Sequence, residues 1–144
     1  MAKIEASTTV DRPVEDVWRA VIDFPNGPKW DPGLLECKVT SEGPLSVGST
    51  VQSRRTTRGA NLVVFRVTEY EPGRKFAAEV MSPRAMRGSR HMETLESVEG
   101  KTKYSIAWDL KVNGLYSLLG PLLARSSKKL AETQVGNLKR MVES

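Results

Sequence analysis

The sequence contains too few metal-ligating and nucleophilic residues for several common classes of enzyme. It has one cysteine, Cys37, and one histidine, His91, which cannot together build a zinc site or close an internal disulfide. The HExxH, CxxC and GxSxG motifs and a glycine-rich phosphate loop are all absent. We therefore expect no metal and no other cofactor, and hydrolysis by a serine triad is disfavoured.

Long hydrophobic runs are missing as well. No apolar segment approaches the roughly 18 residues that a membrane-spanning helix requires. The first residues, MAKIEAST, lack the apolar centre of a signal peptide. We expect a cytoplasmic protein with no integral membrane association, and the lone Cys37 agrees with a reducing compartment.

The composition is that of a globular chain with a basic surface. With 144 residues, 39% hydrophobic and 27% charged, the chain is expected to form a single domain, residues 1–144. The net charge of +5 comes from short interrupted groups such as RR, RGSR and SSKK. Nucleic-acid binding would need a continuous patch and a motif, so we expect no nucleic-acid partner. A monomer or a homodimer is expected.

The hydrophobic periodicity predicts one strand, one helix, six further strands and a final helix. Residues 4–10 alternate as a half-buried strand, and Pro13 suits the first position of the helix that follows. Short turns such as Pro72-Gly73 and Glu99-Gly100 separate the later strands, which favours an antiparallel meander. From about Tyr116 apolar residues recur every three or four positions, as in a long amphipathic helix.

The segment DFPNGPKWDPG, residues 23–33, joins the first helix to the second strand. It packs three prolines, two glycines and Trp30 into eleven residues. That proline density excludes a regular helix or strand. Two interpretations of Trp30 stay open: a lip or plug of a ligand cavity, or a cap on the edge of the core.

Five stretches together resemble one known family. They are VDRPVEDVWRAVIDF, KWDPG, VTEYEPGRKF, EGKTKYSIAW and LLGPLLA…NLKRMVE, in this order along the whole chain. They are similar to the polyketide cyclase/dehydrase branch of the START-like, or SRPBCC, superfamily. The resemblance implies an α+β helix-grip fold, in which a seven-stranded antiparallel sheet wraps a long C-terminal helix around an internal cavity. It also implies that the first helix breaks into a short second one near the cavity mouth.

Turn lengths predict which side chains face that cavity. A two-residue Pro72-Gly73 turn sets Val67 opposite Ala78 and directs an apolar face inward, consisting of Phe65, Val67, Phe76, Ala78 and Val80. A three-residue loop at residues 59–61 would place Phe65 opposite Arg55 and turn Arg55 inward. A two-residue loop would turn Arg55 outward, so its orientation stays open.

The Glu99-Gly100 turn sets His91 opposite Trp108, Glu93 opposite Ile106 and Leu95 opposite Tyr104. Because Tyr104, Ile106 and Trp108 form an apolar face, we expect His91 and Glu93 to point inward with them. The pair could act as catalytic acid and base, or could only orient a ligand. A register slip of one residue would expose both side chains instead.

The favoured function is binding of a hydrophobic small molecule such as a lipid, isoprenoid or polyketide-like compound. Two alternatives stay open: a polyketide cyclase or dehydratase with His91 and Glu93 as catalytic residues, and a protein-interaction module. The expected ligand-binding residues are Trp30, Arg55, Phe65, Val67, Phe76, Ala78, Leu95, Tyr104, Ile106, Trp108, Leu118, Leu119, Leu122 and Leu123.

Overall fold

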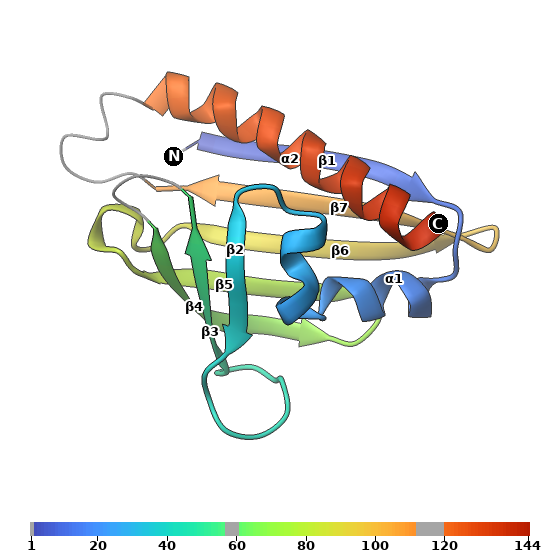
Figure 1. Ribbon diagram of the computed structural model, residues 1–144, viewed down its shortest axis with the longest axis horizontal. Coiled ribbons are helices and arrows are strands. Elements are labelled where there is room, and N and C mark those ends of the chain that lie inside the picture. The colour runs from blue at the N-terminus through green and yellow to red at the C-terminus, as the bar shows by residue number, and fades with distance from the viewer. Residues whose placement is uncertain (1, 57–60, 112–119) are drawn as a thin grey trace.

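A curled antiparallel sheet and a long helix dominate the computed structural model, which describes residues 2–56, 61–111 and 120–144 (Figure 1). The strands run in the order β1-β7-β6-β5-β4-β3-β2. Their bounds are β1 Ala2–Val10, β2 Leu34–Val39, β3 Thr50–Arg55, β4 Leu62–Glu71, β5 Lys75–Ser82, β6 Arg90–Val98 and β7 Lys101–Leu110. The helices are α1 Val14–Val21, α2 Gly120–Glu143 and the short 3-10 turns η1 Phe24–Lys29 and η2 Arg84–Met86.

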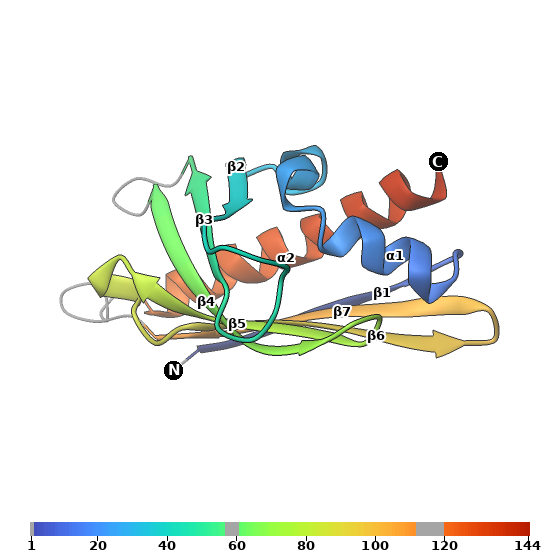
Figure 2. The same ribbon diagram turned by 90° about the horizontal axis from the view of Figure 1, so that it is seen from below.

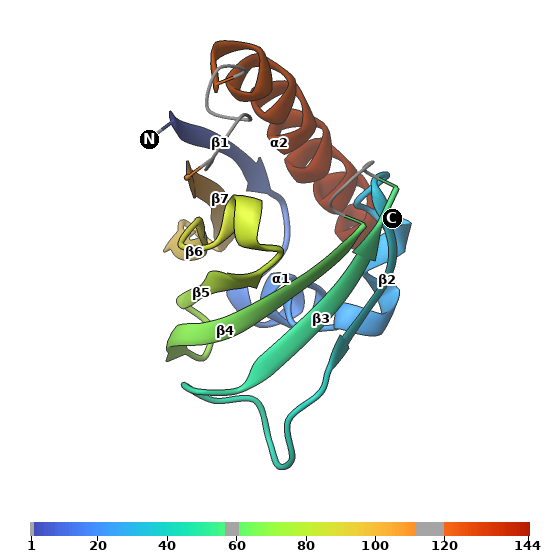
Figure 3. The same ribbon diagram turned by 90° about the vertical axis from the view of Figure 1, so that its left-hand side faces the viewer.

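All helical elements except η2 gather on the concave side of the sheet. Figure 2 shows α1, η1 and α2 above strands β1, β5, β6 and β7, and Figure 3 shows the sheet curling beneath α2. Neighbours in the sheet are consecutive in the chain except for β1 and β7, the first and last strands, which pair with each other. This is the expected helix-grip fold, which is thereby confirmed.

Helix α2 is fixed to the sheet by a buried stripe. Ala131, Val135 and Leu138 are at most 5% exposed and belong to the same core as the inner faces of the strands. The three lie at helical spacing, so one face of α2 meets the sheet. Gly120 and Pro121 start the helix, in keeping with the preference of proline for a first turn.

The outer edge of β1 is also covered by α2. Lys128 Nζ donates a hydrogen bond to the carbonyl of Glu5, and Lys139 Nζ donates to the carbonyl of Thr9 at 2.7 Å. At the end of α2, Glu143 accepts from the backbone N–H of Asp11 at 2.7 Å. That hydrogen bond, together with one from Lys139, lowers the pKa of Glu143. Backbone groups that an edge strand would expose are thus satisfied by the helix.

The expected Pro72-Gly73 turn is one residue longer than predicted. Glu71 pairs with Lys75, which leaves residues 72–74 as the loop, and Gly73 has the positive φ of 79° that glycine tolerates. An irregularity between Val67 and Glu69 adds a compensating residue to β4. Val67 therefore faces Ala78 as expected, although the predicted pairs nearer the turn are wrong.

The packing of α2 makes a direct prediction about stability. Leu138 is fully buried, so Leu138→Ala should lower the free energy of unfolding by about 2–5 kcal/mol. Leu122→Ala is the matched control on the same helix, because that side chain is 64% exposed. Its effect should stay within about 0.5 kcal/mol in the same chemical denaturation experiment. Equal losses of unfolding free energy in the two variants would contradict the packing of this face of α2 against the sheet.

Candidate functional site

A cavity of about 500 Å³ lies between the concave face of the sheet, η1 and α2. Six of the expected ligand-binding residues line it, together with the two catalytic candidates His91 and Glu93. The six are Trp30, Arg55, Phe65, Phe76, Ala78 and Trp108. Further apolar lining comes from Val21, Phe24, Leu34, Val51, Val63, Val80, Leu110 and Leu130. The wall is mostly aliphatic and aromatic, with a few polar groups that converge on it.

Several residues expected in the wall lie elsewhere. Val67, Leu95, Tyr104 and Ile106 are on the inner face but are buried in the packed core. For Leu95, Tyr104 and Ile106 the reason is that α1 packs against β6 and β7 and fills that end of the concave face. Sequence periodicity identified the face but could not show how far along it the covering helix extends.

The start of α2 gives a second difference. Leu122 is 64% exposed, so it lies on the surface rather than in the cavity wall. The stretch LYSLLGPLLA is apolar on nearly every side, which gave no means of choosing the buried face. Leu118 and Leu119 lie outside the described residues, as does the side chain of Leu123.

The hairpin of β6 and β7 has the predicted register. His91 pairs with Trp108, Glu93 with Ile106 and Leu95 with Tyr104. Glu99 and Gly100, with φ of 51° and 81°, form the two-residue turn that sets this pairing. The register prediction is confirmed, and both His91 and Glu93 line the cavity.

Three of these side chains form a hydrogen-bonded chain in the cavity wall. Trp108 Nε1 donates to His91 Nδ1 at 2.6 Å, and His91 Nε2 lies 2.7 Å from Glu93 Oε1. An indole nitrogen can only donate, so Nδ1 must carry the lone pair. The proton of the neutral imidazole is then on Nε2, from which it is donated to the Glu93 carboxylate. Both ring nitrogens are occupied by protein groups.

Glu93 is a buried group whose second oxygen is not paired. Its residue is 6% exposed, and within the described part of the chain neither Glu93 Oε2 nor the Tyr104 hydroxyl has a partner with normal hydrogen-bond geometry. The two residues are nevertheless close. Burial raises the pKa of Tyr104 well above its ordinary value, and the negative charge of Glu93 and a weak hydrogen-bonding contact with it raise that pKa further. Tyr104 therefore stays a neutral phenol next to the carboxylate.

Aromatic rings surround the imidazole of His91. The ring centres of Trp108, Phe65 and Phe76 lie 6.2, 6.4 and 6.5 Å from it. All three line the cavity, and Phe24 extends the group by packing 5.7 Å from Phe76. The polar chain is thus embedded in an aromatic surface.

A buried ion pair forms the second polar group of the wall. Arg55 on β3 makes two hydrogen bonds to Asp31, Nη1 to Oδ2 at 2.9 Å and Nη2 to Oδ1 at 3.0 Å. Their side chains are only 20% and 8% exposed. The pairing of Arg55 with Phe65, one of the two alternatives that the loop length left open, does not form, because Phe65 faces Val51. The true register differs by an even number of residues, which keeps Arg55 on the inner face.

The proline-rich segment 23–33 closes one side of the cavity. Trp30 is 8% exposed and belongs both to the core and to the cavity wall, and its carbonyl accepts a hydrogen bond from Asn137 of α2 at 3.1 Å. A Cβ atom at Gly27 would meet Leu34 Cδ2 at 2.8 Å, so a larger residue there would require the Leu34 side chain to shift. The segment ties η1 to α2 and, through Asp31, to β3.

Sequence reasoning missed several polar residues of the wall, namely Asp31, Cys37, Ser53, Ser89 and Gln134. Asp31 stood in the quoted KWDPG stretch, but its partner Arg55 is 24 residues away and gave no local signal. Burial raises the pKa of Cys37 to about 12, which keeps the thiol protonated and a poor nucleophile.

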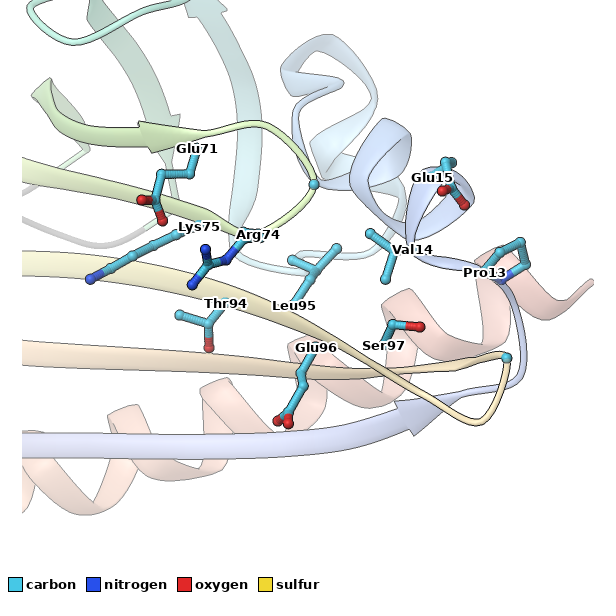
Figure 4. A pocket seen from close by; sticks show the side chains of 12 residues that line it. Pro13, Val14, Glu15, Glu71, Arg74, Lys75, Thr94, Leu95, Glu96 and Ser97 are labelled. Atoms are coloured by element: carbon cyan, nitrogen blue, oxygen red, sulfur yellow. The ribbon is translucent and has the colours of Figure 1, made fainter.

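A second hollow of about 700 Å³ lies outside the cavity, between the start of α1 and the turns that follow β4 and β6. Figure 4 shows Val14 and Leu95 at its centre, with Glu71, Arg74 and Lys75 on one side. Its charges are of both signs, and Lys75 is already bonded to Glu69 at 3.2 Å. We assign it no role.

Within residues 2–56, 61–111 and 120–144, no group of three or more His, Cys, Asp or Glu side chains could hold a metal ion. Within the same ranges, every helix is too short or too polar to cross a membrane.

The ion pair of Asp31 and Arg55 should be energetically coupled. Asp31→Asn or Arg55→Gln alone should each lower the free energy of unfolding by about 3 kcal/mol, since each leaves a buried charge unpaired. The double variant should lose less than the sum of the two by about 0.5–3 kcal/mol. The exposed pair Glu36 and Lys38 is the control, with a coupling of about 0–1 kcal/mol. Strict additivity at the buried pair would contradict this assignment.

The tautomer of His91 can be read directly, because the chain has a single histidine. We expect ¹⁵N NMR of the ring to show the neutral form with the proton on Nε2. Trp108→Phe removes the donor to Nδ1 and should give a mixture of tautomers. Trp18→Phe is the control, because Trp18 packs on Tyr70 at 5.8 Å instead. A proton on Nδ1 in the unaltered protein would contradict the chain of hydrogen bonds.

Comparison with known proteins agrees with this architecture. A family model described as "Polyketide cyclase / dehydrase and lipid transport" matches residues 1–143. No curated relative matches the sequence.

Several solved structures share the fold at low sequence identity. The aromatase/cyclase Zhui from Streptomyces sp. R1128 is 15% identical with a TM-score of 0.79, over 98% of this chain and 93% of that one. A START superfamily protein from Mycobacterium smegmatis is 13% identical with a TM-score of 0.77, over 98% and 99%. The di-domain aromatase/cyclase BexL of the BE-7585A biosynthetic pathway is 18% identical with a TM-score of 0.78; the match covers 99% of this chain and 47% of BexL.

Proposed function

Because the chain belongs to the polyketide cyclase/dehydrase and lipid transport family, we propose that it binds a hydrophobic small molecule in the cavity between the sheet and α2. The bound compound is a lipid, an isoprenoid or a polyketide-like molecule with an apolar body and few polar groups. The protein holds or carries this ligand, and we propose that it does so in the cytoplasm.

One observation carries this proposal: a cavity of about 500 Å³ whose wall is largely apolar. Cavities of about 300–1,000 Å³ with a few placed polar groups are typical of small-molecule sites. Here those groups are the Trp108–His91–Glu93 chain and the Asp31–Arg55 pair. An apolar body would fit the wall, and the polar groups would fix its orientation.

Cyclase or dehydratase activity is the second candidate, and Glu93 is the observation that favours it. A buried carboxylate beside a histidine could move a proton to or from a bound substrate. His91, however, has both nitrogens occupied, so accepting a proton at Nδ1 would break its bond to Trp108. This arrangement suits the orientation of a ligand better than proton transfer, so it favours binding over catalysis.

Filling the cavity should abolish binding without unfolding the protein. Ala78 is 2% exposed, lies opposite His91 and lines the cavity, so Ala78→Phe places a ring in the space of the ligand. Native mass spectrometry of the purified protein should detect a retained apolar compound in the unaltered chain and none in this variant. Leu62→Phe, at a position 41% exposed on β4, is the control.

Three results are informative in this experiment. Retention of the compound by Ala78→Phe, with a cooperative melt, would place the ligand elsewhere. An empty unaltered protein that also ignores added lipids would overturn the proposed function. Conversion of a cyclisable substrate that depends on Glu93 would replace binding by catalysis.

A further inference from the structure

The charges around the cavity do not cancel. Arg55 is neutralised by its two hydrogen bonds to Asp31. Arg90 lies at the rim, with a side chain 47% exposed and 4.0 Å from Glu69. Asp23, which also lines the cavity, accepts a hydrogen bond from Asn26. Glu93 remains as the buried carboxylate, and in the described part of the chain no lysine or arginine forms an ion pair with it.

His91 does not compensate this charge. A positively charged imidazole needs protons on both nitrogens, but Nδ1 is the acceptor for the Trp108 indole. His91 therefore donates one hydrogen bond to Glu93 as a neutral group. The phenol of Tyr104, kept neutral by burial and by Glu93, adds no positive charge either.

The aromatic wall acts in the same direction. Phe65, Phe76 and Trp108 line the cavity around His91 with ring centres within 6.5 Å of it. The faces of such rings carry partial negative charge, which attracts cations and N–H or O–H donors and repels anions. The unpaired charge at this end of the cavity is therefore the buried carboxylate of Glu93, next to the aromatic rings around His91.

We propose that the cavity selects ligands by charge: it takes an apolar molecule whose polar end is a cationic amine or a neutral hydroxyl donor, and it rejects carboxylates. The inference rests on the proposed function and narrows the class of ligand. It runs against the net charge of +5, which alone would favour anions. Ordinary fatty acids are thereby excluded, although the apolar wall would suit their chains.

The alternative orientation places the head group at the rim. A carboxylate held there near Arg90 would leave only the alkyl chain inside, and head-group charge would then matter little. For ligands of equal chain length, the buried head group predicts affinities that depend on its charge, and the head group at the rim predicts nearly equal affinities.

Dodecylamine, dodecanol and dodecanoate separate these possibilities when used below their micellar concentrations at neutral pH. Binding can be followed by intrinsic fluorescence, because two of the three tryptophans, Trp30 and Trp108, line the cavity. We expect the amine and the alcohol to bind about tenfold or more tightly than dodecanoate, the scale of a single unfavourable charge contact of 1.4 kcal/mol.

Glu93→Gln tests the assigned group, since it removes the charge and nearly keeps the shape. Affinity for dodecanoate should rise about tenfold relative to the amine. Glu96→Gln on the exposed face of β6 changes the net charge equally and should leave the preference unchanged.

Equal affinities for all three probes in the unaltered protein would overturn the charge selectivity but leave the proposed function standing. A folded Glu93→Gln variant with an unchanged preference would also overturn it. If that variant fails to fold, the ranking in the unaltered protein decides. Failure of all three probes to bind, with an empty cavity in native mass spectra, would overturn both proposals.

Discussion

Contact between α2 and the inner face of the sheet is the interaction on which the rest of the molecule depends. Ala131, Val135 and Leu138 bury one face of the helix against the curled strands. The helix and α1 cover the concave surface only partly, and the remainder is the cavity. The same packing therefore creates both a core and an unfilled, mainly apolar space. One end of the concave face of the sheet is packed and stabilises the fold, and the other end lines the cavity that could hold a ligand.

Polar groups in this space are held by one another, which limits their chemistry. Arg55 is hydrogen-bonded to Asp31, and His91 is hydrogen-bonded to Trp108 and Glu93. A side chain with its hydrogen-bonding capacity occupied is a rigid and selective surface rather than a reactive one. Cys37 is also unreactive, because burial raises its pKa and keeps it a protonated thiol. Among the described residues that line the cavity, Glu93 Oε2 and Trp30 Nε1 are the buried side-chain atoms that keep no hydrogen-bond partner.

Local sequence signals predicted local geometry well and long-range packing poorly. The Glu99-Gly100 turn was sufficient to predict the partners of His91 and Glu93, because a two-residue turn fixes register. The loop at Pro72-Gly73 is one residue longer than predicted, and a bulge in β4 compensates for the additional residue. The extent of the cavity depends on where α1 meets β6 and β7, and the Asp31–Arg55 pair joins distant segments. Neither the contact of α1 with these strands nor this ion pair can be predicted from the hydrophobic periodicity of the sequence.

The lysines of α2 that bond to carbonyls of β1 have a consequence for self-association. Lys128 and Lys139 occupy acceptors along one border of the sheet, so no further strand can add there without displacing the helix. At the opposite border, β2 pairs with β3 alone among the strands that the structure describes. Two copies of the chain could join their sheets through their β2 borders. The joined sheet would then end at a β1 strand on each side, and both of these strands are covered by α2. Growth by strand addition would stop at two chains, a geometric barrier to fibre formation.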